Sequence, residues 1–338
     1  MTSTRTAEDL LARTREIAET VLFPATLAVD GAERVPAGHL DLLAREGFYG
    51  VAAPPEFGGP DVDFNTACTV LETLAAGCLC TTFVWMQHHG VVLRLAYGDN
   101  ADLRTEWLPR LVTGAVRAGV ALAGTRPGPP ELVASRTRTG YVLNGQSPWV
   151  TGWGMVDVLA VAARDGDKIV WILLDATESE SLTVDPLRMV AVSASNTVTA
   201  HFTEHAVPAY RVIGVQDYAS WMVADGSGLR MNGSLSLGLA ARCLTLLGPS
   251  PLDDELHACR AALDAGTAET LPEARAAASE LAQRAANTLV AHAGSRAILL
   301  AEHPQKLARE ALFLLVFASR PAIKESLLPR LATPPLGH

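Results

Sequence analysis

The sequence is poor in charge, and the charge that it carries is not grouped into basic clusters. Charged residues make up 19% of the 338 residues, and the formal net charge is -9. Nucleic acids and anionic membranes are bound through grouped Lys and Arg side chains. The composition therefore argues against both classes of partner.

Cysteine is scarce, and no apolar run is long. The five cysteines are an odd number without zinc spacing or disulfide-framework density, which fits a reducing compartment, and Cys78-Leu-Cys80 indicates buried packing. Runs such as Ala311 to Ala318 fall well short of the roughly 20 residues that span a bilayer. The N-terminus lacks the order of a signal peptide. We expect a cytoplasmic protein.

Hydrophobic residues reach 49%, enough for burial against a partner chain as well as inside the fold. The chain also exceeds the usual size of a single-core domain, so two or three packed units and oligomerisation are expected.

Hydrophobic spacing divides the chain into three parts. Apolar residues recur at helical spacing over the first third, short β-prone runs follow, and helical spacing returns after Pro208. The predicted fold class is α+β, mostly α: a helical domain (1–114), a small β-barrel or sandwich (115–210) and a C-terminal helical bundle (211–338).

Glycine and proline mark the connections. Prolines and glycines in Ala52 to Pro60 predict an ordered loop between helices, and Gly248 to Asp254 predicts a helix break. Asn144-Gly145 and Asp165-Gly166-Asp167 predict hairpin turns, because Asn or Asp before Gly tolerates positive φ.

Three motifs in this order resemble the acyl-CoA dehydrogenase family. Ala53 to Gly59 is similar to its P-E-x-G-G loop, Trp107 to Gly114 to its W-L-P-x-L-x-x-G helix end, and Gly140 to Thr151 to its G-Y-x-L-N-G-x-K-x-W-I-T segment. The resemblance covers essentially the whole chain and implies FAD as cofactor and an acyl-CoA thioester as substrate.

The resemblance assigns two residues to the flavin ring. Trp149 would cover the isoalloxazine, and the Thr151 hydroxyl would bond near its reactive edge. An indole offers a flat face, and alternation along a strand would put both side chains on one face. Taken alone, however, the pair reads as a core Trp and an ordinary strand Thr.

Further cofactor contacts follow from the same resemblance. Ala121 to Pro127 is similar to an A-L-T-E-P segment, which would place Thr125 and the backbone at Ala123 against the flavin pyrimidine, and Arg296 lies where relatives contact a neighbour's FAD. The segment Gly128-Pro-Pro-Glu131 departs from the family pattern. Two prolines remove amide donors, and Glu131 adds negative charge where a pyrophosphate would lie.

The catalytic base is missing from both family positions. The family's reaction uses a Glu to remove the α-proton, and Ala318 stands at the usual position of that Glu. Leu229 stands at the minority position, before Arg230. Glu310 and Glu325 read as solvated or ion-paired, beside Arg309 and Lys324. No catalytic residue is therefore assigned.

The missing base and the changed FAD segments resemble one branch of the family. Some bacteria that degrade steroid side chains build α2β2 acyl-CoA dehydrogenases in which one subunit is shortened and lacks the base. Gln305 to Phe313 and Arg320 to Ile323 are similar to that subunit. A homologous partner and a bulky, steroid-derived acyl group are implied.

Two other functions stay open. Pro129, Pro130 and Glu131 suit a non-redox acyl-binding or scaffold protein that has lost FAD, and a stand-alone enzyme would need a relocated carboxylate. No metal site is predicted, because the adjacent His88 and His89 point about 100° apart on a helix. Arg309 is either a surface charge or an anion contact at a helix junction.

Overall fold

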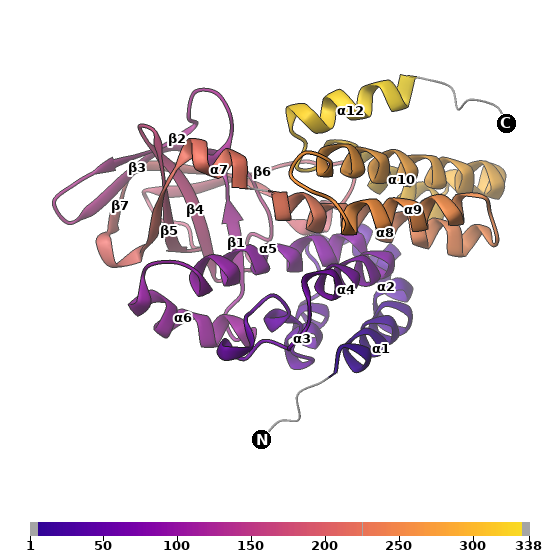
Figure 1. Ribbon diagram of the computed structural model, residues 1–338, viewed down its shortest axis with the longest axis horizontal. Helices are drawn as coiled ribbons and strands as arrows, with labels where there is room; N and C mark the ends of the chain where they lie inside the picture. Colours follow the sequence, from indigo (N-terminus) through magenta and orange to yellow (C-terminus); the bar gives the residue numbers. More distant parts are fainter. Residues whose placement is uncertain (1–5, 225, 333–338) are drawn as a thin grey trace.

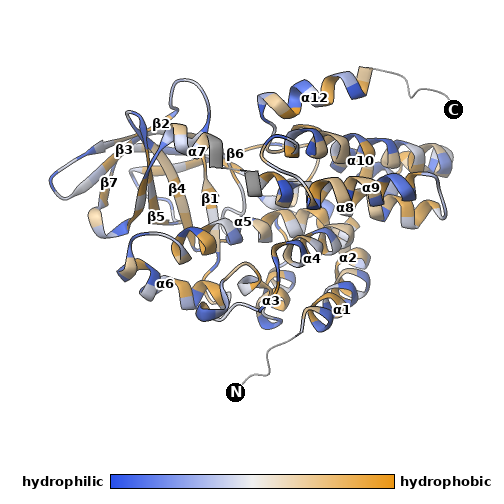
Figure 2. Cartoon of the chain, in the orientation of Figure 1, coloured by the Kyte–Doolittle hydropathy of each residue, from blue (hydrophilic) through white to orange (hydrophobic). Residues whose placement is uncertain are grey.

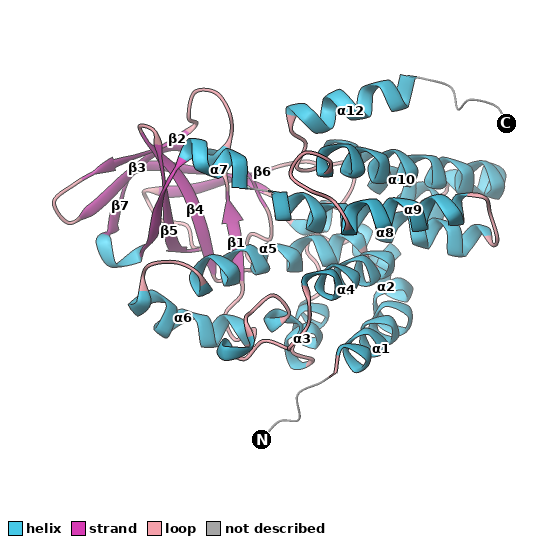
Figure 3. Cartoon of the chain, viewed as in Figure 1, coloured by secondary structure: helices cyan, strands magenta, loops and turns pink. Residues whose placement is uncertain are grey.

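The computed structural model describes residues 6–224 and 226–332, without the side chains of 223–227. Helices, then strands, then helices follow one another along the chain, as the hydrophobic spacing predicted (Figure 3). The sheet lies at one end of the molecule and the helices lie beside and beneath it (Figure 1). The predicted order of the three parts is confirmed.

The N-terminal helices begin at side chains that cap their first turns. Thr6 forms a capping box with Asp9, and Asp63 and Asn100 each accept a bond from the backbone amide three residues further along the chain. The proline-rich loop before α4 contains a single turn of 3-10 helix, as expected of an ordered loop. The helices are α1 (Ala7–Ile17), α2 (Phe23–Asp30), α3 (Ala37–Arg45), α4 (Phe64–Gly77), α5 (Leu79–Ala96) and α6 (Ala101–Val112).

The C-terminal helices share one apolar core with the N-terminal ones. Leu71 and Leu74 of α4 belong to the same buried cluster as Leu235 and Leu239 of α8. The predicted break is confirmed, since α8 ends at Leu247 and α9 begins at Leu252. The elements are α7 (Tyr218–Ala224), α8 (Gly226–Leu247), α9 (Leu252–Asp264), α10 (Leu271–Ala293), α11 (His303–Val316) and α12 (Pro321–Ala332).

The strands form one mixed sheet. Its order is β6-β7-β3-β2-β4-β5-β8, with β1 parallel to β4. The last strand ends at Asp217, so the boundary predicted at residue 210 falls too early. The strands are β1 (Ala118–Ala121), β2 (Leu132–Arg136), β3 (Gly140–Val150), β4 (Val158–Asp165), β5 (Lys168–Asp175), β6 (Leu182–Pro186), β7 (Val198–Pro208) and β8 (Val212–Asp217).

Both faces of the central strands are buried. Alternate residues of β4 enter two different apolar clusters: Leu159 and Val161 join one, while Val158 and Ala160 join another that includes α5 and α6. These strands are accordingly apolar along their length in Figure 2. The helices α5 and α6 thus fix the sheet against the helical part of the molecule.

One predicted turn is confirmed and the other is wrong. Gly166, at φ 59, lies in the tight turn between β4 and β5, where Asp165 pairs with Lys168. Asn144-Gly145 instead lies inside β3, at a register shift opposite β7. The Asn144 side chain accepts the Glu204 amide at 2.8 Å, and Gly145 has φ 119. The Asn-Gly pair therefore makes a β-bulge, which needs the same positive φ as a turn.

Candidate functional site

Trp149 lies in a second irregularity of β3. Its φ is 67, the pairing with β7 shifts between Ser147 and Val150, and the indole is 56% exposed. Thr151 directly follows the strand and is only 3% exposed. The positive φ interrupts strand alternation, so the expectation that both side chains share one strand face is wrong. The bulge turns the indole outward and the hydroxyl inward.

The Thr151 hydroxyl belongs to a buried chain of three. Its Oγ1 lies 3.2 Å from Thr197 Oγ1, which lies 2.8 Å from Ser195 Oγ. All three residues are buried. Ser195 and Thr197 were not singled out from the sequence; the only signal is two hydroxyl residues spaced two apart at the start of a β-prone run.

Backbone bonds join the two segments that carry these hydroxyls. The amide of Gly152 donates to Ser195 O at 2.9 Å, and the amide of Trp153 donates to Asn196 O at 3.2 Å. The Asn196 side chain returns a bond to Trp153 O at 2.7 Å. The segment after β3 is therefore held against the loop before β7 at several points.

The turn that contains Ala123 and Thr125 lies beside β3. The Ala123 amide donates to Ser147 Oγ at 3.3 Å, two residues before Trp149. The Thr125 hydroxyl donates to Leu122 O at 2.8 Å. The structure therefore brings Ala123 and Thr125 close to the strand that carries Trp149, although the Ala123 amide is already used within the chain.

The loop after this turn offers few donors for an anion. Pro129 and Pro130 have no amide hydrogen. The Glu131 carboxylate lies 3.5 Å from Arg126 and accepts a bond from Gln146 at 3.1 Å. The charge of Glu131 is thus partly balanced, but nothing on this loop replaces the missing amides.

The two positions at which the resemblance places the base carry no acid. Leu229 is buried in the helical core. Ala318 is exposed after α11 and has φ 50, so it ends the helix in the left-handed conformation. The buried Arg275 side chain faces the preceding carbonyls, with Phe317 O at 3.4 Å.

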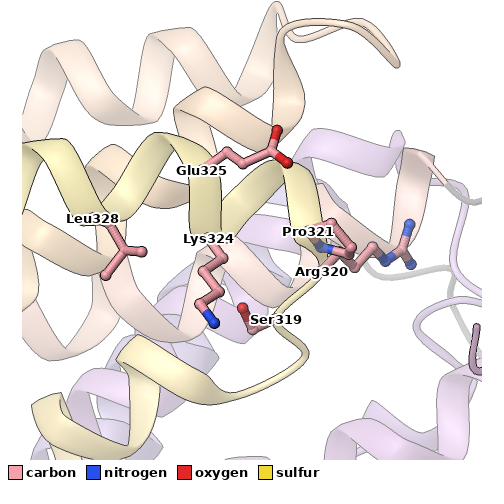
Figure 4. Close-up of a pocket in the computed structure, with 6 residues that line it drawn as sticks. All are labelled: Ser319, Arg320, Pro321, Lys324, Glu325 and Leu328. Atoms are coloured by element: carbon pink, nitrogen blue, oxygen red, sulfur yellow. The ribbon is translucent and has the colours of Figure 1, made fainter.

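An open cavity of about 470 Å³ lies beside this helix end (Figure 4). Glu325 is the one carboxylate among its lining residues, and its side chain points away from Lys324 and Ser319 (Figure 4). Glu325 is exposed to solvent, which agrees with the prediction that it is either solvated or ion-paired. The lining residues are Ser319, Arg320, Pro321, Lys324, Glu325 and Leu328.

Glu310 and Arg309 are neighbours in sequence but do not pair with each other. Each forms an ion pair with another residue. Glu310 is fully buried and pairs with Lys306 at 2.5 Å, and burial raises the pKa of its carboxyl. Arg309 pairs with Asp30 of α2 at 2.5 Å and donates to Val190 O at 2.8 Å. The ion-paired reading of Glu310 is confirmed, and Arg309 is an anion contact at a helix junction.

Arg296 is not joined to the Trp149 region. Its side chain is 77% exposed and pairs with Glu302 at 2.5 Å. Among the described residues, no hydrogen bond or ion pair links it to β3 or to the Ala123 turn. On this chain it faces solvent, where only a second molecule could use it.

The adjacent histidines are structural. His88 accepts the Ala118 amide at Nδ1 and bonds Leu111 O through Nε2, and burial lowers its pKa to about 3. His89 is buried against Trp85 without a hydrogen-bond partner. Over the described part of the chain, no three His, Cys, Asp or Glu side chains are placed to hold a metal ion. None of the described helices is long and apolar enough to cross a membrane.

Comparisons with known proteins give matches to parts of the chain. Residues 4–115 match the model described as acyl-CoA dehydrogenase, N-terminal domain. The 3-sulfinopropanoyl-CoA desulfinase of Variovorax paradoxus is 26% identical over 261 residues, which are 69% of this chain and 63% of that protein. The chain therefore spans under two thirds of the length of this relative.

Solved structures match over nearly the whole chain. A glutaryl-coenzyme A dehydrogenase in complex with glutaryl-CoA superposes with a TM-score of 0.85 at 17% identity, covering 98% of this chain and 97% of that one. A glutaryl-CoA dehydrogenase from Mycobacterium smegmatis in complex with FADH2 gives 0.81 at 17% identity, covering 96% and 94%. At 17% identity, the structural similarity establishes the fold alone.

Proposed function

We propose that this chain is a subunit of an FAD-dependent acyl-CoA dehydrogenase whose catalytic base comes from a partner subunit. Residues 4–115 match the N-terminal domain of acyl-CoA dehydrogenases, and the fold is that of a solved glutaryl-coenzyme A dehydrogenase. One observation carries the proposal: an outward-facing Trp149 lies beside a buried hydroxyl chain, while Ala318 and Leu229 occupy the positions of the base.

The ring-facing residues fit a flavin. The exposed indole of Trp149 presents a flat apolar face for stacking. The chain from Ser195 to Thr151 has three hydroxyl hydrogens and two internal bonds, so one hydrogen is left for an outside acceptor. When bound, FAD would supply the acceptor for the hydride that leaves the β-carbon. Trp149 would then hold the ring in place and exclude water from one face.

The diphosphate end fits less well, and this favours an arrangement with two chains. Pro129, Pro130 and Glu131 leave this chain without the usual amide donors. The Arg296 side chain pairs with Glu302 but is largely exposed, so a second molecule could also contact it. We infer that a partner subunit completes the cofactor site.

Removal of the α-proton requires a base within hydrogen-bonding reach of the substrate. The described part of this chain offers no carboxylate at either family position, and the nearby Glu310 is tied to Lys306. A partner that carries the Glu resolves this gap. Halving the number of active sites also leaves more room for each, which suits a bulky acyl group such as a steroid side chain.

An exposed apolar surface supports a partner of the same fold. Five apolar residues in and just before α11 are at least half exposed, and exposed apolar side chains are common at interfaces. They are Ile298, Leu299, Leu300, Leu312 and Val316.

Co-expression with the gene product encoded next to it tests the proposal. We expect one heteromer on size-exclusion chromatography, with an absorption band of oxidised flavin that is bleached by a steroid side-chain acyl-CoA faster than by octanoyl-CoA. The chain purified alone should not oxidise either substrate. Oxidation by the lone chain at the rate of the heteromer would remove the partner requirement.

A second candidate is a non-redox scaffold of the same fold. It is favoured by the Ala123 amide and the Thr151 hydroxyl, which are both bonded within the chain. A heteromer that contains this chain but no flavin, and that still binds acyl-CoA in calorimetry, would support the scaffold over the dehydrogenase.

A further inference from the structure

Arg164 is a partly buried cation without an acidic partner. It is the last residue but one of β4 and is partly exposed. Its Nε and Nη1 atoms are buried without a hydrogen-bond partner, and no carboxylate pairs with it over the described part of the chain. Buried guanidinium nitrogens are normally paired, because they have lost their contact with water. An anion from outside the chain would supply the missing partner.

The aromatic ring of Tyr218, at the start of α7, holds this guanidinium in place. The Arg164 Cζ atom lies 3.6 Å from the centre of the ring. Such stacking uses the flat face of a guanidinium and leaves its N–H donors free, because they lie in the plane of the group. Nη2 is not enclosed by the surrounding residues, so this edge of the guanidinium faces solvent. A ligand can therefore contact Arg164 at Nη2.

Tyr218 also joins this cation to the turn that contains Thr125. The Tyr218 hydroxyl donates to Arg126 O at 3.2 Å. The turn lies directly on β4, since a Cβ atom on Gly124 would come within 2.7 Å of a backbone oxygen two residues before Arg164. Arg164 therefore lies beside the turn that is proposed to contact the flavin pyrimidine.

The acidic side chains of Glu131, Asp217 and Asp165 lie near Arg164 in the fold without pairing with it. Glu131 lies 3.5 Å from Arg126 instead. Asp217 caps the first turn of α7. Asp165 follows Arg164 on β4, where strand alternation directs it to the opposite face. These acids leave Arg164 available to an external anion.

The sequence of the turn adds positive charge. Thr125-Arg126-Pro127 is similar to the T-E-P part of the A-L-T-E-P segment, so Arg126 stands where that segment has an acid. This change removes one negative charge and adds one positive charge close to Arg164. A planar guanidinium matches the oxygens of a phosphate, so phosphate is the anion that this arrangement favours.

We propose that Arg164, held flat by Tyr218, binds a phosphate group of a nucleotide-containing ligand. Within the proposed function two molecules carry such a group, FAD and the acyl-CoA, and the choice between them rests on that function. One guanidinium supplies charge but does not replace the amides that Pro129 and Pro130 remove. A partner subunit is therefore still needed to complete the cofactor site.

The test compares ligands with and without phosphate. FAD is titrated into the flavin-free heteromer and octanoyl-CoA into the flavin-loaded one, by calorimetry. Arg164→Gln should bind one of these two ligands at least about tenfold more weakly than wild type. Its affinity for the phosphate-free counterparts, riboflavin and octanoyl-pantetheine, should not change. A loss on FAD assigns the site to the cofactor, and a loss on octanoyl-CoA assigns it to the substrate.

Arg15→Gln is the matched control, because it removes the same charge from an exposed arginine of α1, and its affinities should equal those of wild type. Arg164→Lys keeps the charge without the planar donors and should recover only part of the affinity. If Arg164→Gln does not fold, Tyr218→Leu removes the supporting ring and should weaken binding of the same ligand.

Failure of the site differs from failure of the proposed function. Wild-type affinity of Arg164→Gln, or of Tyr218→Leu in its place, for both FAD and octanoyl-CoA overturns the phosphate site and leaves the proposed function standing. A wild-type heteromer that binds neither ligand removes the proposed function. Inorganic pyrophosphate then decides the site alone: tighter binding by wild type than by the variant supports it, and equal binding overturns it.

Discussion

At the scale of single residues, the backbone strain at Trp149 should lower stability, while its side chain should contribute to flavin binding. A non-glycine residue at φ 67 is strained, whereas glycine adopts this conformation freely. We expect Trp149→Gly to be more stable than Trp149→Ala by about 1 kcal/mol in urea unfolding. Both variants should lose flavin binding in a titration, while Trp149→Phe should keep part of it. Equal stability of the Gly and Ala variants would contradict the strain.

His89 gives the stability a pH dependence. Burial holds the pKa of His89 well below its usual value, so the ring is neutral in the folded protein. The unfolded chain takes up the proton below about pH 6.5. The stability that comes from a neutral buried His89 is therefore fully present above that pH and is lost as the pH falls.

The substitution His89→Leu should flatten this dependence. Between pH 6 and 4 we expect the slope of unfolding free energy against pH to fall by up to about 1.4 kcal/mol per unit relative to wild type. Because neither ring nitrogen has a partner, the variant should also fold stably. Urea unfolding at several pH values measures this, and an unchanged slope would show that His89 is protonated when folded.

The residues proposed to face the flavin ring come from the sequence, but their geometry could not be predicted from it. Trp149, Thr151, Ala123 and Thr125 come from segments that resemble the family, and the structure gathers them in one region. The opposite exposure of Trp149 and Thr151 depends on a bulge against β7. That bulge is a long-range property of strand pairing, which local spacing does not encode.

At the scale of elements, the same limit explains the Asn144-Gly145 error. Positive φ at glycine is common to turns and bulges, and only the register with β7 decides between them. We expect Gly145→Ala to lower the free energy of unfolding by more than about 2 kcal/mol. Two effects add: the backbone strain of an alanine at φ 119 and the clash of its Cβ with Glu131 O. Gly166→Ala, with open space around it, should cost about 1 kcal/mol. Similar costs for the two would contradict the close contact.

Helix α11 carries a buried ion pair between Lys306 and Glu310, one turn apart. Removing one partner leaves an unpaired buried charge, so Lys306→Met and Glu310→Leu should each destabilise by about 3–5 kcal/mol. The double variant should recover most of this loss, because two apolar side chains replace the pair.

A partly exposed pair of the same spacing, Arg284 with Glu280, provides the control in a Glu255→Gln background, because Arg284 also pairs with Glu255. Its coupling in a double-mutant cycle should stay below about 1 kcal/mol. A coupling of that size for Lys306 and Glu310 would mean that water reaches the pair.

At the scale of the whole molecule, the order of helical and β-prone segments was predictable because hydrophobic periodicity is local. The joint core of the N- and C-terminal helices was not, since it depends on which helix faces meet. Outside this core, Arg309 of α11 also joins Asp30 of α2 and the loop before β7. The helical parts and that loop are therefore packed against one another.

The most direct test of the account is a single-turnover measurement on the heteromer, with the partner's predicted base changed from Glu to Gln. Acyl-CoA is mixed with the flavin-loaded complex, and flavin absorption is followed in a stopped-flow instrument. We predict that the wild-type complex is bleached and that the Gln complex stays yellow although it binds the substrate. Bleaching of the Gln complex at the wild-type rate would contradict a base supplied by the partner.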